Sequence, residues 1–128
     1  MSLRIVRLGT PRARGEGLRI GTVRFPPRGV AKAKLATDDW YDVWFPLLAP
    51  SRATMKLAQA ATTPAQWNAF ARKYKAEMAR PDARHALELF AALSRTTDLA
   101  VGCYCEREER CHRSILRGLL VECGARLA

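Results

Sequence analysis

The fold is decided by the segment LAVGCYCEREERCHR, which spans residues 99–113. Leu99–Cys105 begins with three apolar residues and predicts a buried strand. Glu106–Arg110 is a charged loop, and Cys111–Leu127 has apolar residues at helical spacing, which predicts the last helix. A strand that leads directly into a helix favours a parallel sheet with helices packed on it.

The N-terminal part of the chain predicts two more strands. Leu3–Leu8 alternates apolar and basic residues, and Leu18–Phe25 is a second apolar segment that ends at two prolines. Trp40–Leu48 is aromatic and apolar but contains Pro46, so we expect a packed loop or a short helical turn there.

The middle of the chain predicts helices. Arg52–Ala61 is a short candidate helix, and Thr63 is followed by a proline and then a glutamine, which is the pattern of a capping box. Pro81 begins another helix. We therefore expect one α/β domain over residues 1–128, with a small, mostly parallel sheet and helices packed on it.

Length and composition set the class of protein. The chain has 128 residues, of which 48% are apolar, which is typical of a globular domain. No apolar run reaches the ~20 residues that cross a bilayer, and Met1–Ile5 lacks the apolar core of a signal peptide. We expect a cytoplasmic protein without a membrane partner, in which the four cysteines are reduced.

Positive charge is concentrated near the N-terminus. The net charge is +10, and residues 1–34 contain nine basic residues against one acidic residue, Glu16. A local positive field attracts polyanions. We therefore expect an anionic small molecule or a nucleic acid as the partner, and the sequence leaves the oligomeric state open.

The chemistry is expected where the strand 99–105 meets the final helix. Sites in parallel sheets lie beyond the carboxyl ends of strands, where Cys111-His112-Arg113 is found. A thiol at a helix start, near positive charge, ionises more easily, so Cys111 is a candidate nucleophile and His112 a candidate acid/base. Arg113 is a candidate anion ligand. The spacing Cys111-x5-Arg117 also occurs in phosphatase loops, but no glycine lies between these two residues here.

A metal site is the alternative use of the same segment. Cys103, Cys105, Cys111 and His112 supply four nitrogen and sulfur donors, which is the number that zinc takes in a closed tetrahedron. Neighbouring residues on a helix diverge by roughly 100°, which argues against Cys111 and His112 as joint ligands. A third reading makes the cysteines small buried apolar residues.

The arginines near Pro26 and Pro27 are further candidate ligands. Arg24 and Arg28 flank a rigid prolyl turn, and a planar guanidinium binds phosphate or carboxylate with two hydrogen bonds. Lys32 follows them and is included in this predicted anion site.

Several stretches resemble a family of small bacterial and archaeal proteins, the domain-of-unknown-function family 488. They include Arg24–Lys32, Trp44–Ser51, the helix Trp67-x2-Phe70-x3-Tyr74-x2-Glu77, and Cys105-Glu106 followed by Cys111-His112-Arg113. The family has an acidic residue before the first arginine and a tryptophan after it, whereas this chain has Val23 and a second proline. The resemblance implies a small α/β domain and supplies no established reaction.

Two hypotheses follow. The first is an anion-binding domain for a nucleotide or nucleic acid, with a Cys-His-Arg site that has the groups of a thiol-based enzyme. The second is a binding module without enzymatic activity, in which Cys103, Cys105, Cys111 and His112 form a structural metal or packing cluster. The sequence leaves open whether the chain is an enzyme and whether it takes zinc.

Overall fold

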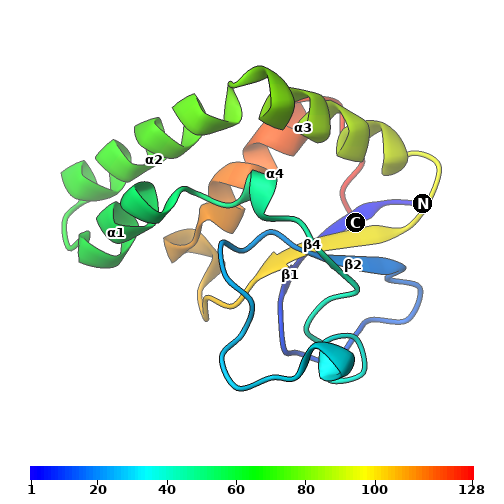
Figure 1. Ribbon diagram of the computed structural model, residues 1–128. Helices are drawn as coiled ribbons and strands as arrows, with labels where there is room; N and C mark the ends of the chain where they lie inside the picture. Colours follow the sequence, from blue (N-terminus) through cyan, green and yellow to red (C-terminus); the bar gives the residue numbers. More distant parts are fainter.

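The computed structural model describes residues 1–128 and shows an α/β fold with a four-stranded sheet, all of whose strands are parallel (Figure 1). The strands are β1 (Leu3–Arg7), β2 (Leu18–Gly21), β3 (Val43–Trp44) and β4 (Leu99–Cys103). Their order in the sheet is β1-β4-β2-β3, so the last strand in the sequence lies between the first two. All five residues of β4 are buried, as a central strand requires.

The helices lie on one side of this sheet, and the long segments that follow β1 and β2 lie on the other (Figure 1). The α-helices are α1 (Arg52–Ala60), α2 (Pro64–Met78), α3 (Pro81–Leu93) and α4 (His112–Glu122). Short 3-10 turns are η1 (Lys32–Lys34), η2 (Pro46–Leu48) and η3 (Glu108–Arg110). No helix combines the length and the apolar character needed to cross a membrane.

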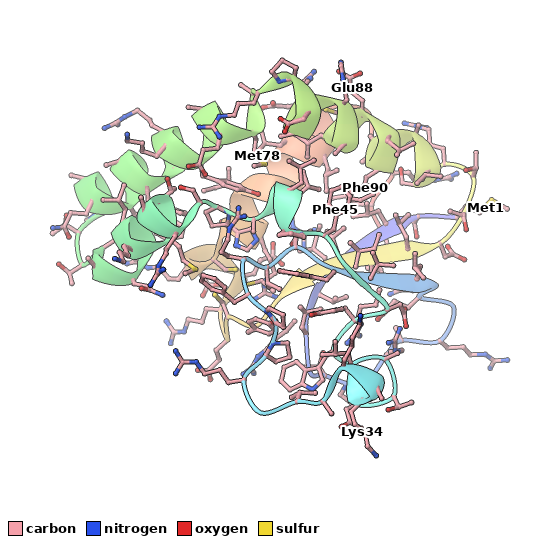
Figure 2. The ribbon with its side chains drawn as sticks, in the orientation of Figure 1. Met1, Lys34, Phe45, Met78, Glu88 and Phe90 are labelled. Atoms are coloured by element: carbon pink, nitrogen blue, oxygen red, sulfur yellow. The ribbon has the colours of Figure 1, made fainter.

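Two apolar clusters hold the layers together. The larger one joins the sheet to the helices, and at its edge the rings of Phe45 and Phe90 lie 5.1 Å apart (Figure 2). The smaller one covers the carboxyl end of the sheet and contains Leu8, Val23, Tyr41, Cys103 and Cys111. Two of the cysteines are therefore part of a packed layer.

Several element boundaries differ from the sequence prediction. The strand expected over Leu99–Cys105 ends at Cys103, because the chain bends at Tyr104. The second strand, expected over Leu18–Phe25, ends at Gly21, where an ideal Cβ would lie only 2.4 Å from the nearest ring atom of Tyr41. The last helix ends at Glu122, since Gly124 has a φ of +92° and the chain then returns to the sheet. The segment Trp40–Leu48, expected as a packed loop or a short helical turn, contains the short strand β3 and then the helical turn η2, which confirms the second expectation for Pro46–Leu48.

The helix starts follow the predicted capping chemistry. Thr63 and Gln66 form the capping box that begins α2, with Pro64 at the first helical position. Ser51 caps α1 by accepting from the backbone N–H of Thr54. Glu77 of α2 accepts from the Ser51 N–H and the Thr54 hydroxyl, both at 2.8 Å, and so joins the two helices.

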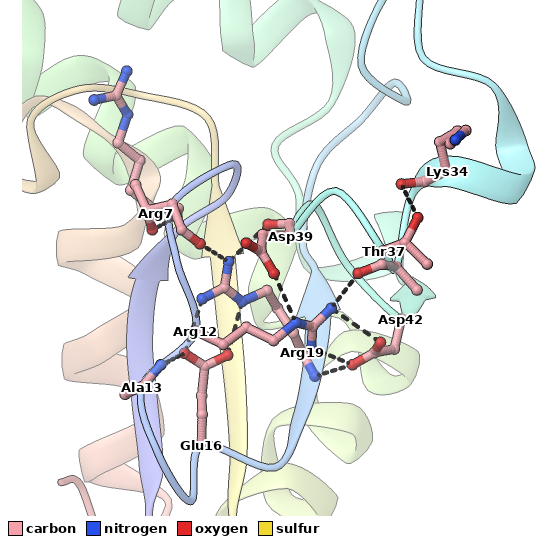
Figure 3. Close-up of polar contacts among 11 residues, drawn as sticks. Arg7, Arg12, Ala13, Glu16, Arg19, Lys34, Thr37, Asp39 and Asp42 are labelled. Atoms are coloured by element: carbon pink, nitrogen blue, oxygen red, sulfur yellow. Dashed lines mark hydrogen bonds and ion pairs between the residues drawn. The ribbon is translucent and has the colours of Figure 1, made fainter.

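A buried ion pair organises the loop between β1 and β2 (Figure 3). Arg19 is fully buried, and its guanidinium makes two hydrogen bonds of 2.8 Å to the carboxylate of Glu16. Its remaining N–H groups donate to the carbonyls of Thr10 and Asp39. Because every guanidinium nitrogen has a partner, this buried charge is fully compensated and fixes two loops relative to β2.

This ion pair predicts a dependence of stability on pH. Burial alone would raise the pKa of Glu16, but the hydrogen bonds from Arg19 and Ala13 reverse the effect and hold this pKa below its ordinary value. A lowered folded-state pKa stabilises the protein above the unfolded-state pKa, and the stabilisation disappears as the pH falls through the folded-state value. We expect the free energy of unfolding to fall as the pH drops below about 5 and through the lowered folded-state pKa of Glu16.

The variant Glu16→Gln should lose about 3 kcal/mol at pH 7, because it leaves the buried Arg19 charge without its counterion. Its stability should also depend less on acid than that of the parent chain. Urea unfolding at several pH values measures both quantities. Glu109→Gln, at an exposed carboxyl, is the matched control, and equal behaviour of the two variants would contradict the prediction.

Candidate functional site

A cavity of about 850 Å³ opens at the carboxyl ends of β2 and β4. One wall is the segment 23–28 after β2, and another is the segment 103–105 at the end of β4. Arg110, Cys111 and His112 contribute the start of α4, and residues of α1 close the opposite side. Cavities of this volume accommodate small molecules of nucleotide size.

Cys111 and His112 lie together in the wall of this cavity. Cys111 is the N-cap residue of α4, and its Sγ lies 3.7 Å from Nδ1 of His112. The other ring nitrogen, Nε2, is 2.8 Å from the backbone carbonyl of Thr22. A carbonyl only accepts, so Nε2–H is the donor of this hydrogen bond, and Nδ1 is the ring nitrogen that faces the thiol.

The surroundings hold this pair in place. His112 is only 6% exposed, and the ring of Tyr74 packs edge-on against it with centroids 5.5 Å apart. The hydroxyl of Tyr74 donates to the carbonyl of Leu48 at 2.7 Å, so that ring is itself anchored. The imidazole therefore keeps one orientation, in which Nδ1 faces Cys111.

Three thiols share the site and affect one another. Sγ of Cys103 lies 3.8 Å from Sγ of Cys105, and both residues line the cavity with Cys111. Hydrogen bonds to its two thiol neighbours and burial raise the pKa of Cys103, which stays a protonated donor. Hydrogen bonds from Cys103 and Cys111, assisted by the Arg113 charge, lower the pKa of Cys105.

The nucleophile candidate is activated by its neighbours. Cys103 is the main cause that lowers the pKa of Cys111; Cys105 and burial act in the opposite direction, and His112 lowers this pKa further. The N-terminus of α4 favours a thiolate at the same place. The geometry thus supports the generation of a thiolate at the cavity wall.

The same atoms are close enough to hold a metal ion. The donor atoms of Cys103, Cys111 and His112 all lie within 4.8 Å of one another, and all three residues are buried. Cys105 is not in this compact set, although its sulfur touches that of Cys103. Although their positions diverge on the helix, Cys111 as the N-cap and His112 as the first helical residue converge on one point.

The predicted anion ligands are only partly brought together. Arg24 and Arg28 both line the cavity, whereas Lys32 is exposed in η1 outside its lining. Arg24 donates to the carbonyls of Ala49 and Pro50, so part of its guanidinium is used for structure. Arg28 is exposed at the cavity and available to a ligand.

Arg113 and Arg117 have structural partners. Arg113 is 3% exposed, lies outside the cavity lining and donates to the carbonyl of Cys105 at 2.5 Å, while its Nε has no partner. Arg117 makes two hydrogen bonds, of 2.6 and 2.8 Å, to Glu108. Arg117 is therefore occupied by an ion pair and not arranged as the arginine of a phosphatase loop.

Sequence reasoning missed some of the lining. Arg52 of α1 lines the cavity together with Cys111, and no local sequence pattern connects two residues so far apart in the chain. The carbonyl of Thr22, which fixes the His112 ring, is a backbone group and has no sequence signal. Arg110 carries a clearer signal, since it precedes Cys111 directly; it lines the cavity and lies over the ring of Trp67.

The basic N-terminal segment is partly structural. Arg19 is buried against Glu16, and Arg12 makes hydrogen bonds of 2.8 and 3.1 Å to the carboxylate of Asp42 (Figure 3). Both charges are neutralised within the fold. The positive field of residues 1–34 is therefore smaller than the residue count indicates.

Comparison with known proteins gives one positive result. No curated protein and no solved structure matches the chain. A family described as the active DUF488-N3 subclade matches residues 3–124, which is nearly the whole chain. This match confirms the resemblance seen in the sequence, and the chain belongs to the DUF488 family, within its active DUF488-N3 subclade.

Proposed function

We propose that the protein is a small thiol-dependent enzyme that acts on an anionic substrate, with Cys111 as the nucleophile and His112 as its acid/base. One observation carries this proposal: in the wall of a cavity, the Cys111 sulfur faces Nδ1 of His112, while the other ring nitrogen is held by the Thr22 carbonyl. A thiol and a base in this relation form an activated nucleophile.

The chemistry that the pair supports is simple. Nδ1 of His112 takes the proton of the Cys111 thiol, and the sulfur forms a bond to an electrophilic atom of the substrate. The bond to the leaving group breaks, and the leaving group takes the proton back from Nδ1. The buried pair is oriented before the substrate arrives, which lowers the cost of reaching the reactive geometry.

The substrate is proposed to carry a phosphate or carboxylate and to be of nucleotide size. Arg28, Arg52 and Arg110 line the cavity as basic groups, and the remaining guanidinium nitrogen of Arg24 joins them. Apolar and aromatic side chains make up much of the rest of the lining. A concave site of this kind suits a small nucleotide better than a long polynucleotide, which binds along an extended surface.

A test of the nucleophile uses iodoacetamide at pH 7. Cys111 should be alkylated about tenfold faster than the partly exposed Cys123 of the same chain, because its thiolate is more populated. His112→Gln should reduce this rate to that of an ordinary thiol. His85→Gln, on the exposed side of α3, is the matched control. Peptide mass spectrometry gives the rate at each cysteine.

A test of the substrate class measures the binding of adenosine monophosphate by calorimetry. Arg28→Ala should weaken binding by about tenfold, since a charged hydrogen bond to phosphate is lost. Lys34→Ala, at an exposed lysine outside the cavity, should leave affinity unchanged. A parent chain that binds neither this nucleotide nor inorganic phosphate would contradict the anionic substrate.

The second candidate function is a metal site, and the compact group Cys103, Cys111 and His112 favours it. Zinc sites with two cysteines and one histidine keep a fourth position open, and here that position would face the cavity. The hydrogen bond from Nε2 to Thr22 is also the usual second contact of a histidine that ligates metal.

Cys111→Ser separates the two functions. If Cys111 is a nucleophile, this variant should keep its unfolding free energy within about 1 kcal/mol, because serine is well tolerated at an N-cap. If it is a ligand, the purified parent should contain about one zinc ion per chain, and the variant should lose both zinc and stability. Elemental analysis measures the zinc content, and urea unfolding measures the free energy of unfolding.

A further inference from the structure

The two cysteines at the end of β4 differ in exposure but touch each other. Cys105 is exposed and lines the cavity, whereas Cys103 is 7% exposed. Their sulfur atoms are 3.8 Å apart. An oxidant from solution therefore reaches the Cys105 sulfur directly, and the Cys103 sulfur lies behind it in van der Waals contact.

The backbone permits a bond between them. The chain bends at Tyr104, so the two cysteines do not have the extended backbone that would place their Cα atoms roughly 7 Å apart, at the limit for a disulfide. Rotation of the side chains must close the sulfur separation to about 2 Å. The guanidinium of Arg113 donates a hydrogen bond to the carbonyl of Cys105 and so fixes this residue next to Cys103.

We propose that Cys103 and Cys105 form a reversible disulfide, with hydrogen peroxide or another hydroperoxide as the oxidant. The sulfur of Cys105 attacks one peroxide oxygen, the O–O bond breaks, and Cys105 becomes a sulfenic acid while hydroxide leaves and takes a proton to form water. The sulfur of Cys103 then attacks the sulfur of Cys105, and a second water leaves. Two thiols are oxidised by two electrons, and one peroxide is reduced to two waters.

The disulfide would regulate the neighbouring site, and this consequence rests on the proposed function. The Cys103 sulfur lies within 4.8 Å of the Cys111 sulfur, close enough to affect its pKa. A disulfide has no S–H to donate, and its formation draws the Cys103 sulfur towards Cys105. Oxidation should therefore slow the reaction of Cys111, and reduction by dithiothreitol should restore it.

Trypsin makes the test direct. Cleavage after Arg95 and Arg107 puts Cys103 and Cys105 in one peptide and Cys111 in another. After treatment with hydrogen peroxide, the first peptide should be lighter by two hydrogen atoms, resist alkylation and recover on reduction. A cross-link between the two peptides, a sulfinic acid at Cys105, or an unchanged peptide would overturn the proposal.

Variants complete the experiment. Cys105→Ser, at the exposed position, should abolish the mass change without loss of fold, whereas Cys123→Ser at the far end of α4 should leave it intact. The alkylation rate of Cys111 is then compared before and after oxidation. A severalfold decrease supports the regulation, and an unchanged rate on the oxidised protein overturns it. A slow rate already in the reduced protein contradicts the proposed function, while the mass change still tests the disulfide by itself.

Discussion

The hydrogen bond from Nε2 of His112 to the carbonyl of Thr22 is the contact on which the candidate site depends. Thr22 is itself fixed to β4, because its N–H and its hydroxyl both donate to the carbonyl of Gly102 at 3.0 Å. One continuous series of bonds thus joins β4, β2 and α4. It sets the position and the orientation of the imidazole, and with them which ring nitrogen faces Cys111.

The residues that carry the family resemblance surround the cavity and hold its walls. Trp44 donates from its indole to the carbonyl of Val23 at 2.8 Å, and this contact fixes the start of the segment with the two prolines. Tyr74 and Glu77 of α2 anchor η2 and α1. Their roles are structural, and they explain why motifs far apart in the chain occur together: each positions one wall of the same cavity.

The arginines divide into two groups with different physical roles. Arg19 is buried and fully bonded, because a buried charge is stable only with its counterion and hydrogen-bond partners. Arg28, in contrast, is exposed at the cavity. Net charge alone does not separate these groups, and only the second group is available to an anion.

Local sequence determined much of this protein. The alternation in Leu3–Arg7, the apolar run of β4 and the capping box at Thr63 predicted their elements correctly, because hydrogen bonding and burial act there over a few residues. The Cys-His-Arg triplet at a strand-to-helix junction also located the candidate site. Tertiary structure decided the rest: β2 stops at Gly21 against the ring of Tyr41, Lys32 lies away from the cavity, and Arg113 is buried. It also brought Cys111 and His112 together with the Thr22 carbonyl. The contact between His112 and Thr22 spans 90 residues, so it depends on the order of the strands in the sheet and not on any local pattern.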